Sequence, residues 1–335
     1  MLFRSFMTDA GHITDGLYFT SNRFNFGDVH MWLDGGYGPS GSTNTNIVKN
    51  TLTDFYSRGV FMRNLQLPTV TGNTMTTLSV NPTPVTALDV ELNAAGGKYI
   101  GNKISFNRTG TGIRFASNSN VGSPAEITNN MVRVGNGIAN TTFALTAQNF
   151  LNTNIYYNTL LVNAPITTLG AALNLQNASA TGTRVYNNII NNTNNGYAYS
   201  ITSGSPALES DFNNIRNNTC SNTSGFTGTN VGFYLSAASA PYYWYTQTGK
   251  DYNSYLSQRY SAPTFLAAPY DMYIADINRF LRGTQAINNV NGGNTNVDID
   301  GTLRRNPPMM GAHELVPVIA FSGPTIDSTD RKSTR

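Results

Sequence analysis

The chain has 335 residues, which is enough for one long domain or two ordinary ones, and its formal net charge is only +3. So small a positive excess gives no basis for expecting nucleic acid or an anionic membrane as a partner. The one cysteine, Cys220, excludes an intrachain disulfide framework. No apolar run approaches the roughly 18 residues that a membrane-spanning helix needs, so we expect no membrane insertion.

Asparagine is the outlier of the composition. The chain contains 44 Asn and 31 Gly, two residues that tolerate left-handed backbone angles and occur often in turns. A chain this rich in both must turn frequently. The composition therefore favours many short strands over long helices.

A five-residue pattern recurs along the first two thirds of the chain: an apolar residue or Thr, any residue, Asn, any residue, and an apolar residue. One copy is Val48-Lys49-Asn50-Thr51-Leu52. Successive copies lie about 27 residues apart, which is an internal repeat of the length found in solenoids. The central asparagines are Asn22, Asn50, Asn73, Asn102, Asn129, Asn158, Asn187 and Asn213.

A second short strand follows most copies of this pattern. It begins with Gly or Ala and alternates between apolar and other residues, as in residues 59–62, 112–115, 171–175 and 196–199. No helical periodicity separates the strands. A propeller blade is longer than this repeat, and a leucine-rich repeat has its own Leu spacing. Two or more short strands in about 27 residues are typical of a coil of a parallel β-helix.

We therefore predict an all-β protein, a right-handed parallel β-helix of about 8–10 coils. Regular coils are expected over residues 15–215, less regular coils over 216–315, and a linker or disordered tail over 316–335. Stacked coils place equivalent side chains in columns about 4.8 Å apart, so the central asparagines should form a hydrogen-bonded ladder. The predicted ladder residues are Asn50, Asn73, Asn102, Asn129, Asn158 and Asn187.

The C-terminal third contains Asp298-Ile299-Asp300-Gly301, two arginines, and then Gly311-Ala312-His313-Glu314. This segment is similar to a closing Asp-x-Asp-Gly…Gly-Ala-x-Glu signature, and through it the chain resembles secreted bacterial right-handed β-helix proteins of the pectin-lyase-like superfamily. Two positions depart from the family pattern, Asn288 in place of Asp and Met310 in place of Ile. Further segments that carry the resemblance are residues 210–214, 244–254, 263–265 and 284–289.

The resemblance implies an extracellular protein with further domains in a larger parent chain. It supports the fold better than any activity. The first residues lack the apolar core and cleavage site of a signal peptide, and the predicted helix begins without a cap, which repeat arrays need for solubility. We therefore expect a fragment of a secreted or cell-surface protein whose export signal lies outside this segment.

Recognisable catalytic and metal-binding patterns are scarce. The histidines His12, His30 and His313 show no metal-ligand spacing, and we interpret His313 as structural. Asp298 and Asp300 have the spacing of calcium ligands, but a role in a turn is the favoured interpretation. No other cofactor is predicted.

The second strand of each coil supplies the candidate site. Strand alternation places Val29, Met31 and Leu33 inward and leaves His30, Trp32 and Asp34 outward. The same alternation in the next coils produces one outward face. Its predicted members are Trp32, Asp34, Phe61, Arg63, Asp89, Glu91 and Arg114.

This face has three interpretations. Aromatic rings stack on sugar rings and charged groups bind their hydroxyls, so Trp32, Asp34, Phe61 and Arg63 are candidate ligand-binding residues. Asp89, Glu91 and Arg114 are candidate catalytic residues, because glycoside hydrolases use paired carboxylates and a lyase needs a base beside a cation. The third and favoured interpretation is a solvated charge ladder between coils, in which each pair contributes little.

Two functions remain open from the sequence. The favoured one is a non-catalytic secreted or cell-surface module, a structural or adhesive scaffold that binds a polysaccharide or surface glycan. The alternative is a polysaccharide lyase or glycoside hydrolase on the same fold. Such enzymes display dense clusters of Asp, Lys and Arg, and this chain has only 18 acidic residues.

Overall fold

The computed structural model describes 16 stretches of the chain. They are residues 6–7, 16–36, 43–78, 83–92, 96–116, 123–138, 140–165, 170–176, 182–201, 208–217, 232–234, 248–254, 265–266, 272–275, 283–284 and 296–315. Everything below refers to these residues. None of them forms a helix of the length and apolarity that crossing a bilayer requires.

One sheet contains eight short strands, one from each winding of the chain. Neighbours in this sheet are parallel and are separated in sequence by a complete winding, as in the pairing of Ile47 with Val70. Its members in spatial order are β2 (Tyr18–Thr20), β4 (Asn46–Val48), β6 (Thr69–Thr71), β9 (Lys98–Ile100), β12 (Ala125–Thr128), β15 (Thr153–Tyr156), β18 (Arg184–Tyr186) and β21 (Glu209–Asp211).

The other sheet has 15 strands and bends around the rest of the winding. In the first two complete windings one long strand makes the bend, β3 (Arg23–Asp34) and then β5 (Thr51–Arg63). Later windings use two strands. The strands before the bend are β7 (Thr74–Thr77), β10 (Lys103–Phe106), β13 (Met131–Val134), β16 (Thr159–Val162), β19 (Ile189–Asn192) and β22 (Asn214–Asn217).

The strands after the bend form the part of this sheet that carries the candidate site. They are β8 (Val85–Glu91), β11 (Gly110–Ala116), β14 (Thr142–Gln148), β17 (Gly170–Gln176), β20 (Tyr197–Ile201) and β23 (Gly232–Tyr234). The two-residue strand β1 (Phe6–Met7) pairs in parallel with β3 at the N-terminal end.

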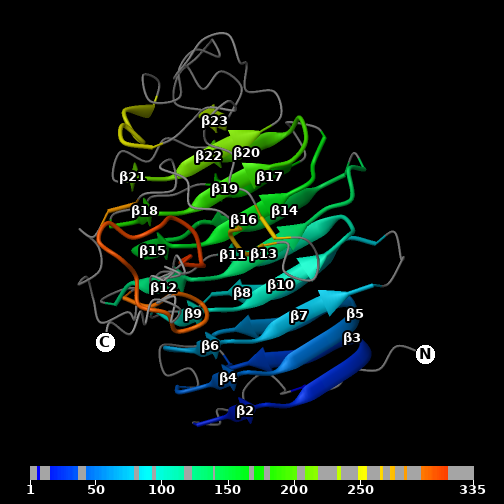
Figure 1. Cartoon of the computed structure of the whole chain (residues 1–335). Helices are drawn as coiled ribbons and strands as arrows, with labels where there is room; N and C mark the ends of the chain where they lie inside the picture. The colour runs from blue at the N-terminus through cyan, green and yellow to red at the C-terminus, as the bar shows by residue number, and fades with distance from the viewer. Residues whose placement is uncertain are drawn as a thin grey trace, which may run out of the picture.

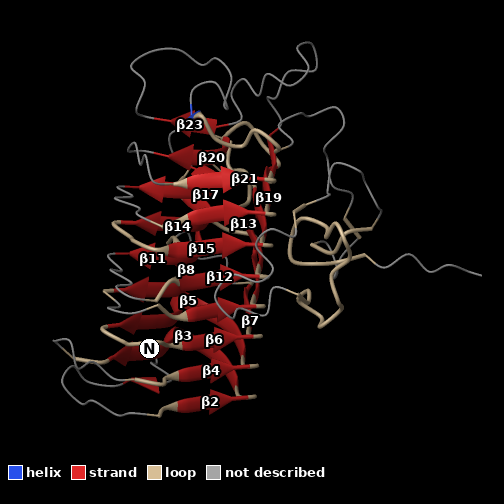
Figure 2. Ribbon diagram, turned by 90° about the vertical axis from the view of Figure 1, so that its left-hand side faces the viewer, coloured by secondary structure: helices blue, strands red, loops and turns tan. Residues whose placement is uncertain are grey.

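The prediction of an all-β parallel β-helix is confirmed. Strands of successive windings lie directly over one another from β2 at one end to β23 at the other (Figure 1), and all the pairings between named strands are parallel. The turned view shows the same stack from another side (Figure 2). The repeat that the sequence shows is thus one winding.

An asparagine ladder joins the windings at the turn between the two sheets. In Asn73, Nδ2 donates to Asn102 Oδ1 at 3.0 Å and to the Ile47 carbonyl of the preceding winding at 2.8 Å, while its backbone N–H also donates to Asn102 Oδ1. Asn73 Oδ1 in turn accepts from the Asn50 N–H, so each ladder side chain satisfies backbone groups of the preceding winding and bonds to the Asn side chain of the next. The ladder residues are Asn22, Asn50, Asn73, Asn102, Asn130, Asn158, Asn188 and Asn213.

Two predicted ladder positions were wrong by one residue: Asn130 and Asn188 occupy the ladder, and Asn129 and Asn187 do not. The residue before each ladder Asn has a positive φ, which is 56° at Asn129 and 58° at Asn187. Asn and Gly adopt this left-handed conformation most readily. Asn suits both the left-handed position and the ladder position. The sequence of an Asn-Asn pair therefore does not show which of the two is the ladder residue, and only the folded winding distinguishes them.

The last ladder residue is capped by a segment that follows the windings. Asn213 Nδ2 donates to Asp251 Oδ1 at 2.9 Å, and Asn213 N–H donates to Ser254 Oγ at 2.8 Å. Asp251 N–H in turn donates to the Ser210 carbonyl at 2.7 Å. The Asp251 carboxylate and the Ser254 hydroxyl thus together accept the two hydrogen bonds that the next Asn would accept.

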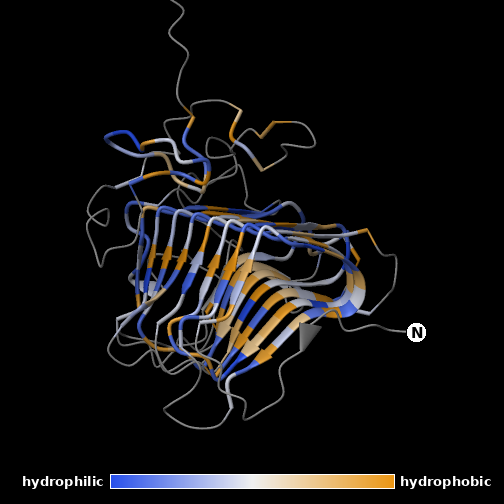
Figure 3. Cartoon of the chain, turned by 90° about the horizontal axis from the view of Figure 1, so that it is seen from below, coloured by the Kyte–Doolittle hydropathy of each residue, from blue (hydrophilic) through white to orange (hydrophobic). Residues whose placement is uncertain are grey.

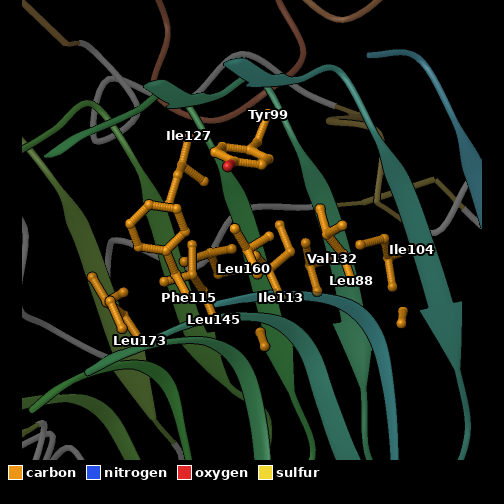
Figure 4. Close-up of a cluster of buried hydrophobic side chains, with 14 of the residues drawn as sticks. Leu88, Tyr99, Ile104, Ile113, Phe115, Ile127, Val132, Leu145, Leu160 and Leu173 are labelled. Atoms are coloured by element: carbon orange, nitrogen blue, oxygen red, sulfur yellow. The ribbon is translucent and has the colours of Figure 1, made fainter. Parts of the chain in front are cut away.

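The core consists of columns of stacked apolar side chains inside the windings (Figure 4). Tyr99, Ile104 and Ile113, from the three sides of one winding, are all fully buried. Burial of each such side chain contributes about 2 kcal/mol to stability. The columns therefore add their contributions winding by winding.

A lateral segment, residues 272–275, 283–284 and 296–315, lies outside the windings (Figures 1 and 2). This segment is held by two residues that each directly precede a ladder asparagine in the sequence. Asn129 Nδ2 donates to the Val297 carbonyl at 2.9 Å, and Asn187 exchanges hydrogen bonds with the Thr284 backbone. Asn129 and Asn187 thus act as anchors on the outside of the stack.

The lateral segment covers apolar residues that point away from the core. Met131 and Leu161 pack against Met272 and Ala312, where the equivalent outward positions of earlier windings carry polar residues such as Thr74. Outward apolar residues in the later windings were the sequence signal for this cover. Within residues 216–315, predicted to form less regular coils, the described strands are the end of β22 and β23, and the range as a whole stays a prediction.

Arg304 is the buried centre of this segment. Its guanidinium group donates to Asn129 Oδ1 at 2.7 Å and to the Met309 carbonyl, and it lies 3.8 Å from the centre of the Tyr157 ring. It also pairs with Glu314 at 3.4 Å, with both side chains fully buried. Hydrogen bonds and a cation–π contact thus compensate for burying this charge.

Replacing a central ladder residue should destabilise the whole stack. Asn102→Leu leaves the Asn73 amide groups and the Val70 carbonyl without their partner, and we expect a loss of about 3 kcal/mol in unfolding free energy. Denaturant unfolding followed by circular dichroism measures this change. Asn107→Leu, at an exposed position, is the control, and equal midpoints for the two variants would contradict the role of the ladder.

Candidate functional site

The outward residues of the strands after the bend form two adjacent columns. In one, Trp32, Phe61, Asp89 and Arg114 are direct neighbours on β3, β5, β8 and β11. In the other, Asp34, Arg63 and Glu91 are neighbours. The structure thus brings together all seven residues of the predicted face, which we call the charged face, and it adds Arg58.

The carboxylates of the charged face are all engaged by guanidinium groups. Asp89 accepts from Arg58 Nε at 2.8 Å and from Arg114 Nη1 at 2.7 Å. Glu91 also pairs with Arg114. Although Asp89 lies on the outer side of its strand, its side chain is only 2% exposed, because the two arginines cover it.

Asp34 forms a second ion-paired unit at the first complete winding. Its carboxylate accepts from Arg63 Nε at 3.0 Å, from Asn64 Nδ2 at 3.0 Å and from the Gly36 N–H at 3.2 Å. Burial by itself would raise the pKa of Asp34, but these hydrogen bonds hold it below its ordinary value. Asp34 is therefore ionised at neutral pH and unsuited to donate a proton.

Interactions of the same kind hold Arg114 in its charged form. Burial would lower its pKa, but the hydrogen bonds and charges of Glu91 and Asp89 raise it above its ordinary value. A guanidinium this firmly paired cannot act as a base. The three predicted catalytic residues, Asp89, Glu91 and Arg114, thus form one closed ion-pair network.

Trp32 and Phe61 form an aromatic pair at the N-terminal end of the charged face. The rings of Trp32 and Phe61 have their centres 4.4 Å apart, and the Arg58 guanidinium lies 5.0 Å from the centre of Phe61 and 5.8 Å from that of Trp32. Phe61 is only 3% exposed, whereas Trp32 is half-buried. A ligand would therefore meet Trp32 and Arg58 before Phe61.

The strict alternation of inward and outward residues fails in β5 just before Phe61. For this reason sequence reasoning did not identify Arg58 as an outward residue. Counting back from the inward Val60 makes Gly59 outward and Arg58 inward. The register instead pairs Arg58 with Thr86 and Val60 with Leu88, so Gly59 lies beside Ala87, an interior residue, and two consecutive residues face the core. Arg58 consequently points outward, where it binds Asp89.

Small residues make these two consecutive inward positions possible. A Cβ atom on Gly112 would lie 2.2 Å from Val132 Cγ1, and one on Gly59 would lie 2.6 Å from the Ala87 carbonyl oxygen. At Gly112 the space is taken by a side chain of β13, and at Gly59 by the backbone of the neighbouring strand β8, so a larger side chain does not fit at either glycine. The equivalent position carries Ala in the following windings, as at Ala144.

His30 occupies this same position in the first complete winding, so the prediction that it points outward was wrong. It is fully buried, and its ring contacts Phe24 and Phe55, with centres 6.2 and 5.9 Å away. Among the described residues neither ring nitrogen has a hydrogen-bond partner. Burial lowers its pKa to about 4, against a smaller opposing effect of Asp54.

Glu126 is a carboxylic acid that sequence reasoning missed. It lies on β12 between Lys98 and Asn154 of the neighbouring strands and is 5% exposed. Its Oε2 has no hydrogen-bond partner among the described residues. Burial raises its pKa above the ordinary value, and the charge of Lys98 only partly offsets this. No sequence pattern distinguishes it from other outward residues.

Asp298 and Asp300, for which the sequence favoured a turn over a calcium site, lie in a tight turn. Asp298 Oδ1 accepts from the N–H groups of Asp300 and Thr302, and Oδ2 accepts from Glu314 N–H. Asp298, Asp300 and His313 have potential ligand atoms within 4.8 Å of one another. However, Lys103 Nζ lies 3.3 Å from Asp300, and His313 Nδ1 accepts from the Ile274 N–H. These contacts fit a structural turn better than a cation.

Comparison with known proteins gives no further constraint. No protein-family model matches the chain, and neither a curated protein nor a solved structure matches it. The geometry above is therefore the basis for assigning a function.

Asp89→Asn should reveal whether the charged face is a structural network. The amide cannot compensate Arg58 and Arg114, so we expect a loss of about 1–2 kcal/mol in unfolding free energy, allowing for the partial exposure of both arginines. Glu209→Gln, in the exposed pair with Arg184, should cost less than about 0.5 kcal/mol. Denaturant titration compares them, and an unchanged Asp89→Asn midpoint contradicts this interpretation.

His30 should make stability depend on pH. Its folded pKa is lowered from 6.5 to about 4, so between these values the unfolded chain binds a proton that the folded chain does not. Stability should fall as the pH is lowered from 6.5 toward 4. The difference between wild type and His30→Leu, from thermal unfolding at pH 7.5, 6, 5 and 4, isolates this contribution, and parallel curves would contradict it.

Proposed function

We propose that this chain is a non-catalytic module of a secreted or cell-surface protein, a stiff scaffold that binds glycans through its charged face. The observation that carries the proposal is the pairing of Asp34, Asp89 and Glu91 with arginines. A general acid or base must exchange protons with its substrate, and these carboxylates are already committed to ion pairs.

The rest of the charged face suits recognition of a polysaccharide. Trp32 is a half-buried ring beside the Arg58 guanidinium group, at 5.8 Å. A flat aromatic surface next to hydrogen-bond donors binds sugar rings and their hydroxyl or carboxylate groups. The ladder and stacked columns hold these groups in place, so little ordering entropy is lost on binding.

A place in the pectin-lyase-like superfamily is part of this proposal. It is supported by the way in which the residues of the closing signature pack together. Asp298 accepts from the Glu314 N–H, and Arg304 donates to Glu314 and to the Gly311 carbonyl. The signature residues thus have a common structural role, and the family's extracellular location is consistent with glycan binding.

A polysaccharide lyase or glycoside hydrolase is the second candidate, and one observation favours it. Glu126 combines burial, a raised pKa and an oxygen without a partner among the described residues, which are the properties of a general acid. Its neighbours in register are Lys98 and Asn154, so a second carboxylate is not adjacent to it. Hydrolysis by paired carboxylates is therefore the weaker proposal.

Glycan binding without turnover is the expected result. On a glycan array, Trp32→Ala should reduce binding by at least about tenfold, or roughly 1.4 kcal/mol. Tyr252→Ala, at an aromatic residue that is 80% exposed elsewhere, should leave binding unchanged.

Incubation with uronate-rich and neutral polysaccharides should release neither unsaturated products nor reducing ends. Turnover that disappears in Glu126→Gln would support the enzyme instead, and turnover that disappears in Asp89→Asn would place the chemistry on the charged face. Either result overturns the non-catalytic proposal.

A further inference from the structure

The two ends of the β-helix differ. At the C-terminal end, Asp251 and Ser254 cap the last ladder residue. At the N-terminal end, which faces the viewer in Figure 3, β2 is the outermost strand of its sheet. On the larger sheet, β1 covers β3 only at Met31 and Trp32. Within the described residues, β2 and the first half of β3 therefore form an open edge.

The ladder is also incomplete at this edge. Every later ladder asparagine accepts two hydrogen bonds at Oδ1 from the winding before it, as Asn50 does from Asn22 N–H and Nδ2. Asn22 Oδ1 receives none from the described residues, and Asn22 is exposed. Its Nδ2 lacks the backbone acceptor that Asn50 Nδ2 finds at the Phe19 carbonyl.

The apolar columns end half-covered at the same edge. Phe19 and Phe24 are partly buried, whereas Ile47 and Leu52, their direct neighbours in the next winding, are fully buried. Tyr18 and Phe26 are each 69% exposed. Large apolar side chains beside unpaired strand groups are the usual features of a strand-addition site.

We propose that this edge binds an extended polypeptide strand in parallel, with Asn at the ladder position and an apolar residue on either side of it. The occupant would add the first part of one more winding to the stack. This surface is separate from the charged face, so the proposal does not depend on glycan binding.

The later windings specify the hydrogen bonds of such an occupant. By equivalence with the Asn46 N–H to Leu17 carbonyl and Thr51 N–H to Asn22 carbonyl bonds, the N–H groups of Tyr18 and Arg23 would donate to the incoming strand. By equivalence with the Ser21 N–H to Val48 carbonyl bond, the Thr20 carbonyl would accept. The incoming Asn would donate its N–H and Nδ2 to Asn22 Oδ1.

The same donor pattern disfavours a second copy of this chain as the occupant. A two-fold axis that keeps the core faces of two copies aligned would bring their β2 strands together in antiparallel order, which does not match the parallel hydrogen-bond pattern of the windings. Head-to-tail stacking is opposed by Asp251 and Ser254, which already cover the other end of the ladder. A strand from a different polypeptide segment meets neither obstacle.

A peptide with the sequence of residues 44–56 of this chain is a suitable probe, because it contains β4, the turn, Asn50 and the start of β5. Fluorescence anisotropy should show saturable binding of the labelled peptide to the full chain. The Asn50→Asp peptide keeps the shape but loses the Nδ2 donor, and it should bind at least tenfold more weakly.

Two variants of the protein test the edge itself. Tyr18→Pro removes the outward N–H at an edge position that tolerates proline, and it should reduce peptide binding at least tenfold. Tyr18→Ala keeps the N–H and should retain most of the binding. Circular dichroism and unfolding midpoints verify that both variants are folded.

Three results would overturn the proposal. They are no binding of the wild-type peptide, equal affinity for the Asn50→Asp peptide, and equal affinity of the wild-type and Tyr18→Pro proteins. Sedimentation of the chain alone gives a separate check, since dimerisation that Tyr18→Pro abolishes would assign the edge to a second copy instead.

Discussion

The structure depends on the pairing of buried backbone groups where each winding turns between its two sheets. At this turn the residue before the ladder is left-handed, so the strand hydrogen bonds are interrupted. The ladder asparagine restores them, because its Oδ1 accepts from the preceding winding and its Nδ2 donates to a backbone carbonyl there. These hydrogen bonds fix the register between successive windings. The stacking of the core columns, the charged face and the positions of the two anchor residues all follow from this register.

The same register between windings explains why outward side chains that are far apart in the sequence form networks. Asp89 lies between Arg58 and Arg114, which are 31 and 25 residues away in the sequence, because parallel pairing makes them neighbours. A column with alternating signs of charge holds adjacent windings together. It also leaves its carboxylates poorly suited to proton transfer, and this links the energetics of the face to the non-catalytic function that we propose.

The ladder turn has a second role on its outer side. Asn129 and Asn187, which precede two ladder asparagines, bind the lateral segment. The outward positions near them, which are polar in earlier windings as at Thr74 and Lys103, include the apolar residues Met131, Leu161 and Ile189. The segment places Met272, Ile274 and Met310 over them. One part of this sheet face is thus polar, and another part is an internal interface with the lateral segment.

The repeat of Asn with apolar neighbours, about 27 residues apart, was sufficient to predict the all-β parallel β-helix, because a local pattern at constant spacing has the same meaning in every winding. It was also sufficient to place Trp32, Phe61, Asp89 and Arg114 in one column, since alternation holds within a regular strand.

Only the tertiary structure shows that Asn130, and not Asn129, is the ladder residue. It also shows that His30 points inward and Arg58 outward, and that Asn129 binds Arg304, 175 residues later in the sequence. These features depend on where the chain bends and on which distant segment covers it. A local pattern does not encode either one, because Asn fits both the bend and the ladder and because two successive inward residues break the alternation of a flat strand.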